Sequence, residues 1–195
     1  MKISPDENLN YFNLMTYTYI PDESDYLNYL YYVTTKSKRV RKKRSMNKLV
    51  ILFIYFFMGL FLYNRQGLVT SGLFLALCLP TYFLYGYFEK KQYLKHFTKY
   101  IKANYSQEIG VTTTITLDDD GVSIALGDSK TKMMWTEIEE INETGSLLLI
   151  QEKSQNAIVI PKQKTARLDE LTTELKAIAG KHAIPYLEEL DWKWR

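Results

Sequence analysis

Two long apolar stretches without a charged residue dominate the hydropathy pattern of the chain. The first covers residues 49–63, the second covers residues 67–88, and the polar residues 64–66 separate them. At about 1.5 Å per residue, a helix over the second stretch is roughly 33 Å long, which is enough for the hydrocarbon core of a bilayer. The first stretch is shorter and crosses only if its polar ends reach toward the headgroups. The pattern therefore predicts a transmembrane helical hairpin over residues 48–88, with its turn at residues 64–66.

Two other interpretations of the apolar stretches are weaker. A cleaved signal peptide disagrees with the predominantly polar segment of 48 residues before the first stretch and with the second stretch that follows directly. The remaining alternative is a buried hairpin in a soluble protein. Pro80 lies near the middle of the second stretch and removes a backbone hydrogen bond, so we expect a tolerated kink there.

The segment before the hairpin predicts a strand and a helix. Residues 14–20 are rich in Thr and Tyr, which favours a strand, and Pro21 ends it. Asp22 is placed to cap a helix that begins with acidic residues and continues through residue 32. This amphipathic helix either lies along the membrane surface or runs directly into the first apolar stretch.

Short β-type runs separated by turn signals follow the hairpin. The predicted strands cover residues 111–117, 121–126, 131–135, 139–143, 146–151 and 156–161. Without helices between them, such strands predict an antiparallel meander. One amphipathic helix follows at residues 166–179, with Thr165 as its cap, Gly180 as its stop, and an apolar face of Leu168, Leu171, Leu175 and Ile178. The strand at 14–20 is a candidate to join this sheet, which would make the hairpin an insertion.

The predicted fold class is therefore membrane α+β: a two-helix transmembrane hairpin and an antiparallel β domain capped by a C-terminal helix. The predicted parts are a strand and amphipathic helix with a basic run (1–47), the hairpin (48–88), a basic linker helix (89–110) and the β domain (111–195).

Charge divides the chain into two parts and gives the hairpin a direction. Residues 1–102 carry 15 Lys and Arg against 6 Asp and Glu, whereas residues 103–195 carry 10 against 16. Basic residues crowd into 36–48 and 89–102, while the turn contains only Arg65. Because basic residues near membrane ends stay on the cytoplasmic side, both termini are predicted to be cytoplasmic. The expected contacts with anionic headgroups are Lys38, Arg39, Arg41, Lys42, Lys43, Arg44, Lys90 and Lys91.

Candidate chemistry is sparse. The single Cys78 cannot form an intramolecular disulfide, and two isolated histidines do not form a zinc site of the usual kind, so no metal or cofactor is expected. Residues 118–121 read as an exposed hairpin turn, because adjacent carboxylates lack the alternating spacing of a calcium loop. No nucleophile and base pair or phosphate loop is visible, which favours a protein that is not an enzyme. The basic run adjoins a membrane segment and the folded domain is acidic, so nucleic-acid binding is not expected.

Two groups of side chains are candidates for a partner surface. Glu137, Glu139, Glu140 and Glu143 are expected to form a solvated acidic face that could dock a basic partner or the chain's own lysine-rich segment. Trp192 and Trp194 lie beside basic residues in the tail, a composition that favours a membrane interface, a sheet edge or a protein partner equally.

The sequence resembles the YcxB-like family of bacterial membrane proteins. The resemblance includes the acidic helix entry at 21–32, the basic run, the two apolar stretches and three short motifs in the β domain. These motifs are Trp135-Thr136-Glu137-Ile138, Ile141-Asn142-Glu143 and Ile158-Val159-Ile160-Pro161-Lys162. The resemblance implies a pleckstrin-homology-like cytosolic domain and a multi-pass protein of the bacterial cytoplasmic (inner) membrane. Independently, the spacing of Trp135, Ile138 and Ile141 predicts that they are core residues.

Three classes of function follow from these observations: an interaction protein, a transporter or channel component, and an enzyme that acts at the membrane surface, which the missing catalytic motif disfavours. The leading hypothesis is a membrane-anchored, non-enzymatic interaction or scaffold protein that presents its β domain to a protein partner. An immunity protein against a membrane-directed bacterial toxin is a related alternative. A small transporter or channel component would require a homo-oligomer, because the apolar stretches contain no ionisable residue to line a path.

Overall fold

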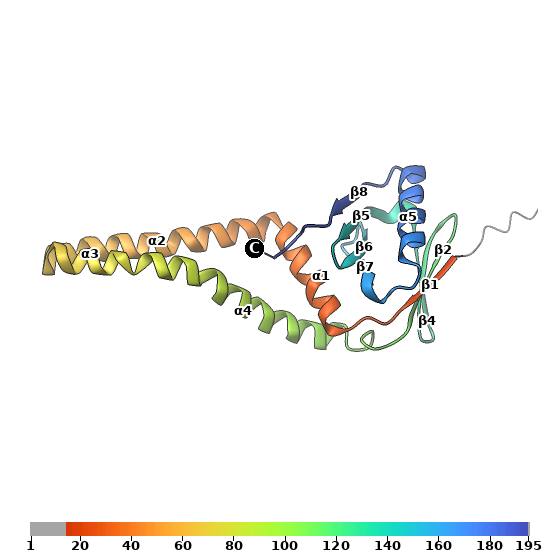
Figure 1. Ribbon diagram of the computed structural model, residues 1–195, viewed down its shortest axis with the longest axis horizontal. Helices are drawn as coiled ribbons and strands as arrows, with labels where there is room; N and C mark the ends of the chain where they lie inside the picture. The colour runs from red at the N-terminus through yellow and green to blue at the C-terminus, as the bar shows by residue number, and fades with distance from the viewer. Residues whose placement is uncertain (1–14, 195) are drawn as a thin grey trace, which may run out of the picture. The chain divides into compact units, whose positions relative to one another are not determined.

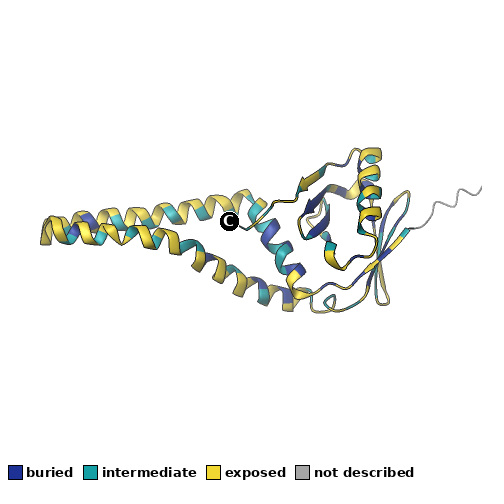
Figure 2. Cartoon of the chain, in the orientation of Figure 1, coloured by how far each residue is buried: buried dark blue, intermediate teal, exposed yellow. Residues whose placement is uncertain are grey.

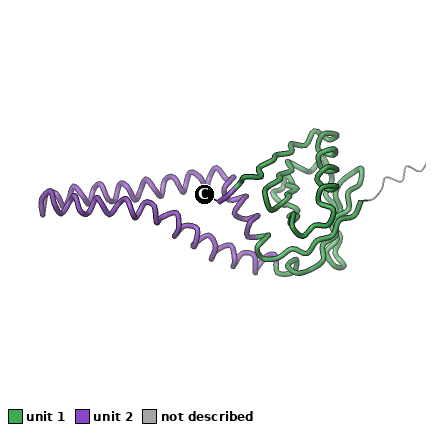
Figure 3. The backbone as a smooth tube through the Cα atoms, viewed as in Figure 1, with its two compact units in different colours: residues 1–26, 106–192 green, residues 27–105, 193–195 purple. Residues whose placement is uncertain are grey.

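The computed structural model describes residues 15–194, which form two compact units (Figure 3). The β unit comprises residues 1–26 and 106–192, and the helical unit comprises residues 27–105 and 193–195. The chain leaves the β unit after its first strand and returns before its second. Residues 27–105 of the helical unit are therefore an insertion in the β unit, as the sequence allowed.

The first sheet of the β unit has four antiparallel strands in the order β1-β2-β3-β4. They are β1 (Met15–Tyr19), β2 (Thr113–Leu117), β3 (Gly121–Leu126) and β4 (Ser129–Met134). Figure 1 labels β1, β2 and β4 of this sheet. Tyr17 of β1 pairs with Ile115 of β2, so the N-terminal strand joins the sheet made after the insertion. Alternate residues of β2 are buried, which is the expected pattern for a strand with one core face.

The second sheet has the order β7-β6-β5-β8. Its strands are β5 (Ile138–Thr144), β6 (Leu147–Glu152), β7 (Ala157–Pro161) and β8 (Tyr186–Glu189). The first three are antiparallel neighbours, but β8 pairs parallel to β5. The predicted antiparallel meander was therefore incomplete. Strand β8, which follows the C-terminal helix in the sequence, adds a parallel pair to the sheet.

The six strands predicted after the insertion are all present, with bounds within two residues of those expected. Trp135 does not end a strand. It begins a short 3-10 helix, η1 (Trp135–Glu137), between the two sheets. Trp135, Ile138 and Ile141 are all buried in the core, as predicted from their spacing.

Helix α5 (Leu168–His182) contributes Leu171, Leu175 and Ala179 to the core of the β unit. Its ends differ from the prediction. Arg167 is the N-cap residue, because the hydroxyl of Thr165 donates instead to the carbonyl of Pro161 in a turn after the 3-10 helix η2 (Lys162–Lys164). Gly180 lies inside the helix, which ends at His182 and is followed by the C-cap residue Ala183 in the left-handed conformation.

The two points where the chain leaves and re-enters the β unit are held together. The carboxylate of Asp22 accepts hydrogen bonds from the backbone N–H groups of Ser24 and Asp25, so it caps helix α1 (Glu23–Lys36) as predicted. Lys164 forms ion pairs with Asp22 and Asp25. The hydroxyl of Tyr26 donates to Glu108 at 2.6 Å. These contacts fix the start of α1 on the β unit.

The helical unit contains the rest of α1 and three further helices. They are α2 (Lys38–Gln66), α3 (Leu68–Ala76) and α4 (Cys78–Asn104). Ser37 interrupts the path from α1 to α2, and its hydroxyl accepts from the N–H of Val40 as an N-cap. The basic linker helix expected at 89–110 is the C-terminal part of α4 and ends at residue 104.

The polarity of residues 64–66 predicted the turn between α2 and α3 at these residues. The structure places the turn at Gly67 instead. Residues 64–66 complete the last turn of α2. Gly67 has a φ of 84°, which glycine adopts at little cost, and its N–H donates to the carbonyl of Tyr63. The backbone requirement at the turn therefore outweighs polarity in placing it.

Helices α2 and α3 approach each other closely at a small residue. The hydroxyl of Ser71 donates to the carbonyl of Gly59 at 2.9 Å. A Cβ at Gly59 would lie 2.8 Å from a methyl group of Leu75, so a larger residue at this position would require the Leu75 side chain to move. The hydroxyls of Tyr55 on α2 and Thr81 on α4 are 2.7 Å apart.

Pro80 disrupts the second apolar stretch, as expected. Helix α3 ends at Ala76, and α4 begins two residues before the proline. The ring of Pro80 has no N–H to donate to the preceding turn. The carbonyl of Leu77 accepts from both the backbone N–H and the hydroxyl of Thr81.

Helix α2 and the α3–α4 segment are each long and apolar enough to cross a membrane. In the most apolar window of each, only 6% of the residues are buried. Figure 2 shows these helices mostly in the colour of exposed residues. Large apolar side chains along both segments, such as Phe57 and Phe83, therefore contact no other part of the described chain extensively.

Candidate functional site

The predicted basic residues lie at one end of the paired helices. Residues 38–44 form the first two turns of α2, and residues 89–102 belong to α4. We call these two segments the basic end. Among the residues predicted to contact headgroups, Arg44 is partly buried and the others are exposed: Lys38, Arg39, Arg41, Lys42, Lys43, Lys90 and Lys91.

An ion pair joins the two helices at the basic end. The Nε of Arg44 lies 2.8 Å from a carboxylate oxygen of Glu89, whose side chain is only 7% exposed. The guanidinium of Arg44 also lies over the ring of Trp194, 4.8 Å from its centroid. Trp194 in turn packs against the rings of Tyr31 and Tyr93. The tail tryptophan is thus a partly buried neighbour of the ion pair.

A cavity of about 330 Å³ opens beside this ion pair. Helix α2 lines it with Lys43, Arg44 and Asn47, and α4 lines it with Tyr85, Glu89, Gln92, Tyr93 and His96. Within each helix these positions are separated by one, three or four residues, which places them on a common face. The sequence did not reveal this grouping. The one sequence feature that could have indicated this cavity was Glu89, the only acidic residue between residues 26 and 107.

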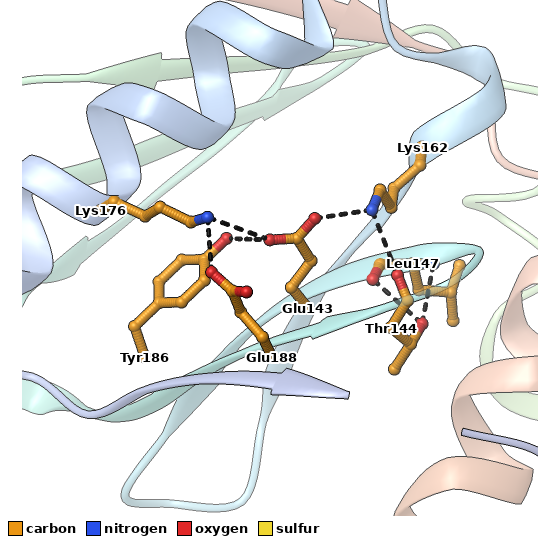
Figure 4. A network of polar contacts seen from close by, with 7 residues as sticks. All are labelled: Glu143, Thr144, Leu147, Lys162, Lys176, Tyr186 and Glu188. Atoms are coloured by element: carbon orange, nitrogen blue, oxygen red, sulfur yellow. Dashed lines mark hydrogen bonds and ion pairs between the residues drawn. The ribbon is translucent and has the colours of Figure 1, made fainter. Parts of the chain in front are cut away.

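A polar network in the β unit surrounds the buried carboxylate of Glu143 (Figure 4). Lys162 donates to one carboxylate oxygen at 2.6 Å, and the hydroxyl of Tyr186 donates to the other at 2.7 Å. Lys176 lies 3.9 Å from Glu143 and 2.6 Å from Glu188. The network therefore ties β5 to β8, to α5 and to the segment after β7.

The charges around Glu143 stabilise its ionised form. Burial by itself raises the pKa of this carboxyl, but the hydrogen bonds from Lys162 and Tyr186 and the two lysine charges outweigh it. The pKa of Glu143 therefore lies below its ordinary value. Burial and the neighbouring carboxylate also raise the pKa of the Tyr186 hydroxyl. Because both of its carboxylate oxygens accept hydrogen bonds within the β unit, Glu143 has a structural role.

The lowered pKa of Glu143 predicts an acid-dependent loss of stability. A carboxyl with a depressed folded-state pKa stabilises the fold above its ordinary pKa, near pH 4.5, and loses that contribution as the pH falls. We expect Glu143→Gln to lower the free energy of unfolding by about 2 kcal/mol at neutral pH and to flatten its decline as the pH falls below about 5. Urea unfolding at several pH values measures both effects.

The exposed Glu139 provides a matched control for this prediction. Glu139→Gln makes the same chemical change on the same strand outside the network, so we expect its pH dependence to follow the unsubstituted protein. Equal pH dependence in Glu143→Gln and the unsubstituted chain would contradict a stabilising role for the ionised network.

The residues predicted as a partner surface have separate local environments. Glu137 accepts a hydrogen bond from the N–H of Met134, Glu140 accepts one from the amide of Asn142, and Glu139 is exposed. Trp192 is partly buried in the β unit, and its backbone N–H donates to the carbonyl of Glu189. Glu143, the fourth glutamate of the expected acidic face, is instead buried in the polar network with Lys162 and Tyr186.

The acidic turn between β2 and β3 is internally bonded. Asp118 accepts from the N–H groups of Asp120 and Gly121 and pairs with Lys132 at 2.9 Å. Asp119 pairs with Lys181 of α5, also at 2.9 Å. Across residues 15–194, no three His, Cys, Asp or Glu side chains are grouped so that they could hold a metal ion.

These features define a class of protein. A β unit of two four-stranded sheets and one core helix carries, between its first two strands, an insertion with two helices that are long and apolar enough to cross a membrane. Residues 117–170, from the end of β2 to the start of α5, match the model of the family described as YcxB-like protein. This match confirms the resemblance seen in the sequence. No curated protein and no solved structure matches the chain.

Proposed function

We propose that this chain is a membrane-anchored, non-enzymatic interaction protein. Helix α2 and the α3–α4 segment cross the bacterial cytoplasmic membrane as a hairpin, with both termini in the cytoplasm. The β unit is a pleckstrin-homology-like domain that presents a surface to a protein partner.

The exposure of the apolar helices is the observation that carries this proposal. The core helix of a soluble protein buries its apolar residues, whereas 94% of the most apolar windows of these two segments remain unburied. Exposed apolar surface on this scale exceeds what a soluble monomer tolerates and is suited to lipid. The polar groups between the helices are paired with one another, as the bonds of Ser71 to Gly59 and of Tyr55 to Thr81 illustrate.

The distribution of charge supports the orientation. The basic end carries the cluster at residues 38–44 and the lysines of α4, whereas the turn at Gly67 is preceded by the single Arg65. Positive residues are retained on the cytoplasmic side, so the basic end faces the cytoplasm. The β unit, which is attached to that end by both of its chain connections, is then cytoplasmic as well.

The architecture of the β unit supports the proposed fold relationship. Four consecutive antiparallel strands, three further antiparallel strands and a core helix follow in the order expected for a pleckstrin-homology-like domain. The insertion after β1 and the parallel strand β8 are additions to that arrangement. Ion pairs between charged groups of the β unit hold its elements together.

Affinity purification of the full chain from membranes in a mild detergent tests the interaction role. We expect a stoichiometric protein partner, and we expect Glu139→Lys to reduce its recovery by reversing an exposed charge on β5. Asp128→Lys, in the exposed turn between β3 and β4, is the matched charge reversal and should leave recovery unchanged. Recovery of only a self-assembled ring that conducts ions would overturn the interaction role in favour of a channel.

A further inference from the structure

We propose that the cavity between α2 and α4 binds the phosphate-bearing headgroup of an anionic phospholipid. This inference rests on the membrane hairpin of the proposed function, and it assigns a specific site where the charge pattern alone indicates only a basic surface. The site consists of the eight lining residues given above.

The lining is rich in groups that donate hydrogen bonds to phosphate oxygens. Lys43 supplies an ammonium group, Asn47 and Gln92 supply amides, and His96 supplies a ring nitrogen. The hydroxyls of Tyr85 and Tyr93 add two further donors. Phosphate oxygens are held by such convergent donors, and bonds to a charged group are stronger than bonds between neutral groups.

The charge of the cavity favours an anion. Its one carboxylate, Glu89, is buried in its ion pair with Arg44, so that pair adds no net charge. Lys43 is exposed and forms no ion pair within residues 15–194. The net charge of the lining is therefore positive, and its unpaired cation stands at the rim, where an anionic headgroup would meet it.

The position of the cavity along the helices favours a lipid over a free anion. Asn47 lies two residues before the first apolar stretch, and Tyr85 lies within the last turn of the second. Next to them, the ammonium of Lys48 lies over the ring of Tyr82, 5.6 Å from its centroid, a pairing suited to the headgroup region. If the hairpin crosses the bilayer, the cavity opens at headgroup depth, where basic pockets between membrane helices bind anionic lipids.

A matched pair of lysine substitutions tests the site. Full-length protein in a non-ionic detergent is titrated with short-chain phosphatidylglycerol, and binding is followed by native mass spectrometry. We expect Lys43→Gln to weaken binding at least about tenfold, because it removes a charged bond to phosphate. Lys42→Gln removes the same charge from an exposed position outside the cavity and is expected to weaken binding by about fivefold at most.

A substitution without a charge change separates the cavity from general electrostatics. Gln92→Leu should weaken binding of phosphatidylglycerol although the net charge of the protein is unchanged, whereas Gln66→Leu, next to the turn, should not. Equal effects of Lys42→Gln and Lys43→Gln, together with no effect of Gln92→Leu, would overturn the site and leave only a diffuse basic surface.

Two further ligands distinguish the source of the phosphate. Short-chain phosphatidylcholine, which has a phosphate but no net charge, should bind more weakly than phosphatidylglycerol. Inorganic phosphate should displace the lipid poorly, and binding of inorganic phosphate as tight as that of the lipid would contradict a lipid site. In membrane fractionation, Lys43→Gln and Gln92→Leu should remain in the membrane, so failure of the site is distinguishable from failure of the membrane anchor.

Discussion

Replacing Gly121 with alanine is expected to destabilise the β unit by about 3 kcal/mol, near the upper end of the effects of overpacking a core. Gly121 begins β3 and pairs with Met134 of β4. A Cβ at this position would overlap the carbonyl oxygen of Met133 and lie 2.9 Å from its carbonyl carbon. Because these atoms are backbone and not the end of a flexible side chain, the strands themselves must move to admit one methyl group.

Gly180→Ala is the matched control, because it adds the same methyl group where space is open. No heavy atom lies within 4 Å of a Cβ at Gly180, and the residue lies inside α5. Alanine loses less conformational freedom in a helix, so we expect this variant to gain about 0.5–1 kcal/mol. Urea unfolding of the full chain, followed by tryptophan fluorescence, measures both changes. Equal stabilities of the two variants would contradict the close approach of β3 and β4.

Local sequence patterns were sufficient to predict most elements of the β unit. Each strand between residues 113 and 161 combines β-forming residues with a clear turn signal. Most of these strands pair with the strand that precedes or follows them in the sequence. The helix at 168–182 has an apolar face that the sequence displays at helical spacing. Its caps were not predictable in the same way, because Thr165 has an alternative partner in the carbonyl of Pro161.

The features that escaped prediction depend on contacts between distant residues. Strand β8 is four residues long, and it is held by parallel pairing with β5 and by a bond between Tyr186 and Glu143, which are 43 residues apart. The cavity at the basic end likewise depends on Arg44 and Glu89, which are 45 residues apart. No local pattern of hydropathy or charge contains this information. The lone acidic residue in a basic segment was the only clue.

A cysteine at residue 64 is expected to be accessible from outside the cell. Residue 64 lies in the last turn of α2, next to the turn at Gly67, and therefore at the opposite end of the paired helices from Arg44 and Glu89. A hairpin that keeps its basic end in the cytoplasm must place this turn on the outer surface. The effect is all or none, because the bilayer blocks an impermeant reagent completely.

The native thiol and the β unit provide the controls for this experiment. Cys78 is the single cysteine of the chain, so Cys78→Ser gives a background without reactive thiols. Ser154→Cys places a thiol in the exposed turn between β6 and β7, on the unit proposed to be cytoplasmic. Neither Cys78→Ser nor Ser154→Cys changes the length of the two apolar stretches.

Labelling of Asn64→Cys and Ser154→Cys in intact cells, each in the Cys78→Ser background, tests the membrane hairpin most directly. A membrane-impermeant maleimide should modify Asn64→Cys in intact cells and Ser154→Cys only after lysis. Modification of Asn64→Cys only after lysis, or of Ser154→Cys in intact cells, would contradict a hairpin with both termini in the cytoplasm.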